Sequence, residues 1–201
     1  MDVRQLVLVT HRWLGLATSG VLAIAGVTGV FLIWRERWWW EQSELLVFAG
    51  RVSSPIHERL ALGSVGSFVV VTATGLAILM EVGGLILWWR RKTLWVRPGR
   101  GWWRMCFDLH HVIGAVFLPL MLMLVVTGFV MGVTHPDDYP WLWRFMARLH
   151  RGQYGFAIEL LYALASAGFL VQGLTGLAVW WRPNGTNKVR READELTRSP
   201  L

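Results

Sequence analysis

The sequence predicts an all-α membrane protein: a four-transmembrane-helix bundle made of a tandem two-helix repeat, with both termini cytoplasmic. The first observation is composition, since 54% of the 201 residues are hydrophobic and only 16% are charged. The second is that four stretches of about twenty residues carry no charge, which is the helical length that crosses a hydrocarbon layer of roughly 30 Å. The third is a set of motifs that recurs in the two halves of the chain.

The expected spans are about 11–34, 60–89, 110–134 and 156–181. Glycines interrupt these runs, but an unsatisfied backbone in lipid costs several kcal/mol, so helix is retained. We therefore expect residues 1–183 to form one membrane domain and residues 184–201 to form a polar cytoplasmic tail.

The basic residues predict the orientation. With the N-terminus inside, thirteen Lys or Arg residues fall on the inner side and seven on the outer side. Short inner loops of membrane proteins are enriched in these residues, so both termini are expected in the cytoplasm. The net charge of +7 is then a topology signal, and nucleic acid is not an expected partner.

Each expected span has a histidine at its head, and the spans repeat in pairs. The motif His11-Arg-Trp-Leu-Gly15 recurs ninety-nine residues later as His110-His-Val-Ile-Gly114. The remaining matched features are Thr28-Gly29 with Thr127-Gly128, His57 with His150, and Gly84-Leu-Ile-Leu-Trp-Trp-Arg90 with Gly176-Leu-Ala-Val-Trp-Trp-Arg182.

Paired histidines on neighbouring helices are what axial ligation of a b-type haem requires. An imidazole is readily neutral at neutral pH, because its ordinary pKa is near 6.5. His11 and His110 begin spans on the inner side, and His57 and His150 begin spans on the outer side. The sequence therefore predicts two bis-histidine haem sites, one on each side.

Haem also needs close helix approach and cations for its propionates. Glycines are expected to allow the approach and arginines to bind the propionates. The glycines are Gly15, Gly20, Gly29, Gly114 and Gly128, and the arginines are Arg12, Arg59, Arg104 and Arg148.

Other readings stay open for several residues. Any single histidine of the four, taken alone, is more typical of an interfacial residue than of a ligand, and only the placement of all four at matching repeat positions favours ligation. His111 is an alternative inner ligand, although it aligns with Arg12. His135 has no counterpart in the repeat and is expected at the surface, with contact to an outer acceptor as the alternative. Glu81 is costly inside a span unless it faces the bundle or water, and a proton or quinol role is open for it.

Four segments together resemble the PepSY-associated transmembrane family, over about residues 5–183. The family includes inner-membrane reductases of ferric siderophores in bacteria. The resemblance implies haem ligation by the four histidines and electron flow from cytoplasm to periplasm. Larger members carry a periplasmic domain between the first two spans, where this chain has about twenty-five residues. The segments are His11-Arg-Trp-Leu-Gly15, Phe107-Asp-Leu-His-His-Val-Ile-Gly114, Leu149-His-Arg-Gly152 and Thr175-Gly-Leu-Ala-Val-Trp-Trp-Arg182.

We therefore expect a membrane ferric-chelate reductase that carries electrons through two b-type haems to a periplasmic ferric siderophore or chelate. No Gly-x-Gly-x-x-Gly follows a strand-like run, so the donor is expected to be a separate cytoplasmic reductase or quinol. One alternative is a cytochrome subunit that exchanges electrons with quinol and a partner protein. Another is a structural or assembly subunit whose histidines bind nothing.

The second span raises a problem of length. From His57 to Trp88 a continuous helix would rise about 46 Å, which exceeds the hydrocarbon core. The second helix must therefore tilt, project outward, or begin after His57, and the same holds for the fourth helix after His150.

Overall fold

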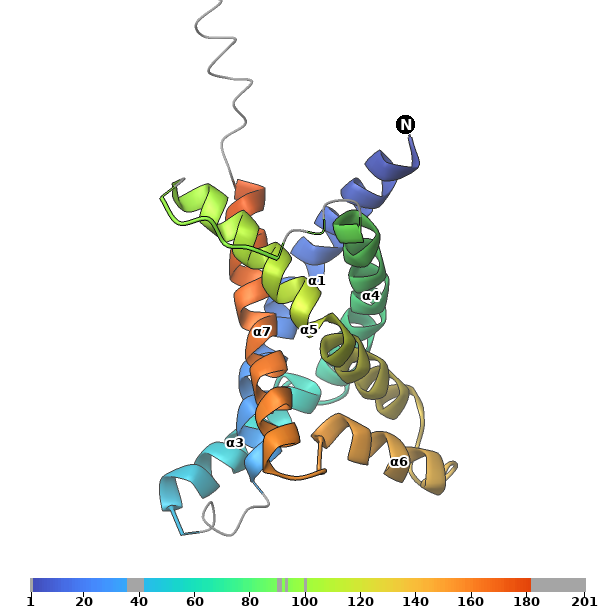
Figure 1. Ribbon diagram of the computed structural model, residues 1–201. Coiled ribbons are helices and arrows are strands. Elements are labelled where there is room, and N and C mark those ends of the chain that lie inside the picture. Colours follow the sequence, from blue (N-terminus) through green and yellow to red (C-terminus); the bar gives the residue numbers. More distant parts are fainter. Residues whose placement is uncertain (1, 36–41, 90–91, 93, 100, 182–201) are drawn as a thin grey trace, which may run out of the picture.

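The computed structural model describes residues 2–35, 42–89, 92, 94–99 and 101–181. Within these residues every regular element is an α-helix (Figure 1). The expected polar tail, 184–201, lies outside the described residues. The helices are α1 (Val3–Trp34), α3 (Glu44–Arg59), α4 (Gly63–Trp89), α5 (Trp102–Val133), α6 (Pro140–Arg151) and α7 (Phe156–Trp181).

The four long helices α1, α4, α5 and α7 are each long and apolar enough to cross a membrane, which confirms the predicted multi-pass fold. α1 and α5 each pack against both α4 and α7, so the four helices form a closed ring. The first half of the chain supplies α1, α3 and α4, and the second half supplies α5, α6 and α7. The bundle is therefore a tandem repeat in space as well as in sequence.

α1 and α5 begin eight residues earlier than expected. The start of α1 is fixed by a capping box, in which the Asp2 carboxylate accepts from the Gln5 amide at 2.7 Å and the Gln5 side chain accepts from the Asp2 amide at 3.3 Å. His11 and His110 therefore lie about two turns inside their helices and not at the heads.

The ends of the bundle differ in structure. The starts of α1 and α5 lie together with the ends of α4 and α7, and we call this the proximal end (Figure 1). The short helices α3 and α6 lie at the opposite, distal end. In the orientation predicted from the basic residues, the proximal end is the cytoplasmic one.

His57 and His150 belong to these short helices and not to the spans that follow them. α3 ends at Arg59 with Leu60 in the left-handed region (φ 49°), and α6 ends at Arg151 with Gly152 there (φ 63°). A left-handed residue stops a helix and redirects the chain. Of the three solutions to the length of the second span, the structure shows the third. The membrane helix α4 begins at Gly63, after His57.

Small residues allow the close helix contacts, but not all of those expected. A Cβ at Gly26 would lie 2.4 Å from the Ser166 carbonyl oxygen, so α1 and α7 meet backbone to backbone there. The prediction for Gly20 is wrong, because a Cβ there meets no heavy atom of the described residues within 4 Å. Gly20 is exposed on the outer surface of α1, where a glycine has no packing consequence.

Candidate functional site

The four predicted histidines lie in two pairs inside the bundle. The ring centroids of His11 and His110 are 6.3 Å apart, at an interplanar angle of 82°. Those of His57 and His150 are 5.9 Å apart, at 62°. Each pair combines one histidine from each repeat, as the sequence predicted, while the binding of haem by these pairs stays a prediction.

Every one of these rings lies against a glycine of its own repeat. A Cβ added at the glycine would lie only 3.2–3.4 Å from the Cε1 atom of the histidine, so any larger residue would press on the ring. The glycines therefore create the space in which the imidazoles lie. The contacts are Gly84 with His11, Gly29 with His57, Gly176 with His110, and Gly128 with His150.

Hydrogen bonds assign the proton of the ring to Nδ1 in the first repeat. Nδ1 of His11 lies 2.9 Å from the Met80 carbonyl oxygen, and Nδ1 of His57 lies 2.9 Å from that of Ala25. A carbonyl oxygen only accepts, so Nδ1 must be the protonated nitrogen. Nε2 then keeps its lone pair, which is the arrangement of a histidine that binds a metal through Nε2.

Threonine hydroxyls lead to the same assignment in the second repeat. Nδ1 of His110 lies 3.2 Å from Thr175 Oγ1, and Nδ1 of His150 lies 2.9 Å from Thr127 Oγ1. Both hydroxyls donate their own hydrogen to a carbonyl four residues earlier, at 2.6 Å in each case. The threonine oxygens therefore accept from Nδ1–H, and Nε2 is again free of the proton.

One of the four positions departs from this pattern. Thr28, Thr127 and Thr175 each precede the glycine under a histidine and each contact its Nδ1. Before Gly84 the chain has Gly83 instead. His11 therefore has its bond to Met80 without a neighbouring hydroxyl. Two Thr-Gly pairs, at Thr28 and Thr127, mark the repeat in the sequence. The roles of Thr175 and Gly84 emerge only from the structure, although Thr175-Gly176 repeats the same dipeptide.

Burial of the distal histidines favours their neutral form. Burial lowers the pKa of His57 below its ordinary value, against the opposing effects of its bond to Ala25 and of nearby Glu58. Burial, with His57 as a further cause, lowers the pKa of His150 to about 3. A neutral imidazole is the form that ligates a metal, so these residues are in the required state at neutral pH.

A cavity of about 590 Å³ lies at the proximal pair and is lined by His11 and His110. Its volume is in the range of small-molecule and cofactor sites, about 300–1,000 Å³. The walls come from α1, α4, α5 and α7 and are mainly apolar. Arg12 lines the cavity, and so does Arg4, which no motif of the sequence marked as a candidate.

The donor set suits haem iron. Two metal–nitrogen bonds of about 2 Å, with the depth of the two rings, place axial imidazole centroids roughly 6 Å apart, close to both observed separations. A protein-only metal centre usually needs three or more ligands. In the part of the chain that the structure describes, no group of three or more His, Cys, Asp or Glu residues is placed to hold an ion.

The two remaining histidines lie outside the pairs. His111 lines the proximal cavity, but its Nδ1 bonds to the carbonyl of Phe107 at 2.9 Å and its ring packs on the Phe107 ring at 4.1 Å. The residue opposite His11 is therefore His110 and not His111. The side chain of His135 is 65% exposed and lies beside Asp137, which confirms its expected surface position.

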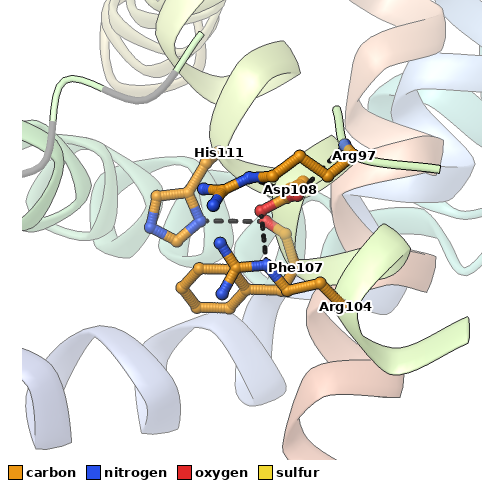
Figure 2. Close-up of polar contacts among 5 residues, drawn as sticks. All are labelled: Arg97, Arg104, Phe107, Asp108 and His111. Atoms are coloured by element: carbon orange, nitrogen blue, oxygen red, sulfur yellow. Dashed lines mark hydrogen bonds and ion pairs between the residues drawn. The ribbon is translucent and has the colours of Figure 1, made fainter. Parts of the chain in front are cut away.

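Beside the proximal cavity, Asp108 is fully buried between two arginines (Figure 2). Its carboxylate lies 3.0 Å from Nε of Arg104 and 3.6 Å from Nε of Arg97, and it accepts from the Arg97 backbone amide at 3.2 Å. The Arg104 contact is an ion pair without hydrogen-bond alignment. This cluster ties the segment before α5 to the helix. The sequence predicts Arg104 as a partner of a haem propionate, but in the structure its guanidinium pairs with the Asp108 carboxylate.

Comparisons with known proteins give one similarity, to a family model. No curated protein and no solved structure matches the chain. The family model of the PepSY-associated TM region matches residues 47–141, which run from α3 through α4 and α5 to the first residues of α6. The matched segment contains His57 and His110 but not His11 or His150. Residues 47–141 of this multi-pass membrane protein are thus similar to the PepSY-associated TM region.

Proposed function

We propose that this protein binds two b-type haems, one between His11 and His110 and one between His57 and His150, and conducts electrons across the bacterial inner membrane. One observation carries the proposal. The same arrangement occurs four times: a histidine with Nδ1–H engaged, its ring against a glycine, and a second such histidine about 6 Å away. Interfacial or core histidines have no need of this repetition.

The chain's own residues have distinct tasks in this proposal. A bound haem supplies one-electron chemistry at its iron. The histidines would hold the iron through Nε2, and their Nδ1–H bonds would fix the ring orientation and raise ligand basicity. Arg4 and Arg12, which line the proximal cavity, are placed to bind the haem carboxylates.

The two pairs lie near opposite ends of the bundle. From His11 to Thr28, the threonine that contacts His57, α1 rises by about 26 Å. From His110 to Thr127, the threonine that contacts His150, α5 rises by the same amount. This separation is most of the roughly 30 Å hydrocarbon thickness, so electrons that pass between the pairs cross most of the membrane.

The family resemblance supports a ferric siderophore or another ferric chelate as the periplasmic acceptor. One electron per ferric ion would give the more weakly held ferrous ion, which makes the protein a membrane ferric-chelate reductase. The donor would be a cytoplasmic reductase or quinol at the proximal end.

A second candidate is a cytochrome subunit that passes electrons from quinol to a partner protein. It is favoured by the short connection at the distal end, where α1 ends at Trp34 and α3 begins at Glu44. This connection leaves no room for a domain that recognises a chelate. A partner protein would then supply the acceptor.

Two measurements test the proposal. A pyridine haemochrome assay on purified protein is expected to give two haems per chain, and His11→Ala or His57→Ala should each remove one. In proteoliposomes with reductant sealed inside, an external ferric chelate is expected to reoxidise the haems and accumulate ferrous iron. Colourless protein would overturn the proposal. If haems are present but external chelates fail to reoxidise them, the ferric-chelate reductase is excluded and the cytochrome subunit becomes the favoured function.

A further inference from the structure

The proximal cavity contains a carboxyl group that the proposed function does not use. Glu81, on α4, lines the cavity and is only 6% exposed. Neither of its carboxyl oxygens has a hydrogen-bond partner among the described residues. A buried polar group without a partner costs several kcal/mol, and an unpaired charge costs more.

The repeat shows that the fold does not require this carboxyl group. When Gly84 is aligned with Gly176, the position equivalent to Glu81 is Gly173 in α7. Gly173 packs closely on α1, where a Cβ would lie 3.4 Å from the Ser19 carbonyl oxygen. The equivalent position of the second repeat thus carries no carboxyl group. Gly173 lines the same cavity, so Glu81 makes the two sides of the proximal site different.

The other ionisable groups that line the cavity come from two helices. α1 supplies Arg4, His11 and Arg12, and α5 supplies His110 and His111. Among the described residues that line the cavity, α7 supplies none, and its polar residue Gln172 donates to the His110 carbonyl at 2.8 Å. The cavity is therefore a mainly apolar space, and Glu81 is the carboxyl-bearing residue among the described residues that line it.

We propose that Glu81 is a proton-binding site coupled to the electron at the His11–His110 pair, an inference that rests on the proposed function. When one electron arrives from the reductase or quinol, the positive charge at this site falls by one. One proton from water then binds a Glu81 carboxylate oxygen and forms an O–H bond. When the electron leaves for the acceptor, the O–H bond breaks and the proton returns to water, so each electron is accompanied by one proton.

The physical reason is charge balance in a poorly solvated space. A ferric centre beside Glu81 stabilises the carboxylate, while the loss of that positive charge on reduction favours the neutral acid. Higher pH then disfavours reduction, because a proton must be taken up. The potential of the proximal haem should fall as pH rises, whereas the distal haem should be less sensitive.

The test is a potentiometric titration of both haems at several pH values in the purified haem protein. His110→Ala identifies the proximal haem by its loss. A tenfold change in proton concentration gives up to about 59 mV per pH unit for one proton and one electron. We expect this dependence in the wild type and in Glu81→Asp, and its loss in Glu81→Gln.

Glu159→Gln is the matched control. Glu159 is also 6% exposed and lies in a span, but it does not line this cavity. Its substitution should leave the pH dependence of the proximal haem unchanged. If the protein binds two haems but the potential of the proximal haem does not depend on pH, the role of Glu81 is overturned and the proposed function is not. The same holds if the potential depends on pH equally in the wild type and in Glu81→Gln. Protein without haem would overturn the proposed function as well.

Discussion

The imidazole planes of His11 and His110 stand almost at right angles, at 82°, although the two residues occupy equivalent positions in the repeat. The corresponding angle for His57 and His150 is 62°. The two repeats thus meet at each pair with their rings crossed and not parallel.

This crossing predicts a spectroscopic signature. Two axial imidazoles at right angles leave the π-type d orbitals of ferric iron nearly equal in energy, so the electron paramagnetic resonance spectrum should be low-spin and highly anisotropic. We expect the proximal haem to show the greater anisotropy, assigned by its absence in His11→Ala. A high-spin signal would contradict ligation by two imidazoles at that site.

Gly84 should be essential for the proximal site. Its Cβ would lie 3.2 Å from Cε1 of His11, so Gly84→Ala should displace the ring and Gly84→Val should abolish binding of one haem. Overpacking of this kind typically costs about 1–3 kcal/mol. Haem content per chain measures the effect. The control is Gly20→Ala, where the added Cβ meets open space, and equal loss in both variants would argue against a specific role.

Thr127 should strengthen haem binding at the distal site. Thr127→Val keeps the shape of the side chain but removes the oxygen that accepts from Nδ1–H of His150. Loss of such a supporting hydrogen bond typically lowers metal affinity by about 10–100-fold. Haem transfer to an apo-acceptor protein would report faster loss of one haem.

Thr74 provides the comparison for that experiment. Its hydroxyl donates to carbonyls of its own helix, at 2.9 Å and 3.1 Å, so Thr74→Val should retain both haems. If Thr127→Val behaved like Thr74→Val, the hydroxyl would have no part in fixing the histidine.

The sequence predicted the membrane spans and which histidines pair with each other, because the repeat consists of His, Thr and Gly residues at fixed spacing. It did not predict which glycine lies under each histidine. That contact joins residues such as His11 and Gly84, and it depends on how α1 and α4 are rotated about their axes. The rotation is set by many small packing contacts, and α4 lies in a strongly apolar segment without a distinct polar face to mark it.

The turn between α3 and α4 is only partly marked in the sequence. Leu60 and Ala61 carry no turn signal although both adopt positive φ, whereas Gly63, with φ 61°, is a residue that favours this conformation. The hydrogen bond of His57 to the Ala25 carbonyl in α1 ties the end of α3 to the bundle. The charge cluster of Asp108 was missed because Arg97 precedes it across a turn whose geometry is not encoded in spacing.

Asp108 should be important for stability at the proximal end. Asp108→Asn removes the buried charge that contacts the partly exposed side chains of Arg97 and Arg104, and loss of a hydrogen bond to a charged group typically costs about 1.5–3 kcal/mol. Thermal unfolding in detergent should therefore occur at a clearly lower temperature. The control is Asp137→Asn, whose side chain is 89% exposed and whose melting temperature should be unchanged. Equal melting temperatures would show that the cluster contributes no net stability.

Each histidine is supported by its own repeat but faces a histidine of the other. A single repeat therefore holds one half of each site and completes neither. Two copies of a half-length chain, related by a two-fold axis, would assemble both sites at once, as in an isologous dimer. Because the repeats are covalently linked, the two halves need not be identical, and equivalent positions can differ. Gly83 is equivalent to Thr175, and Glu81 is equivalent to Gly173.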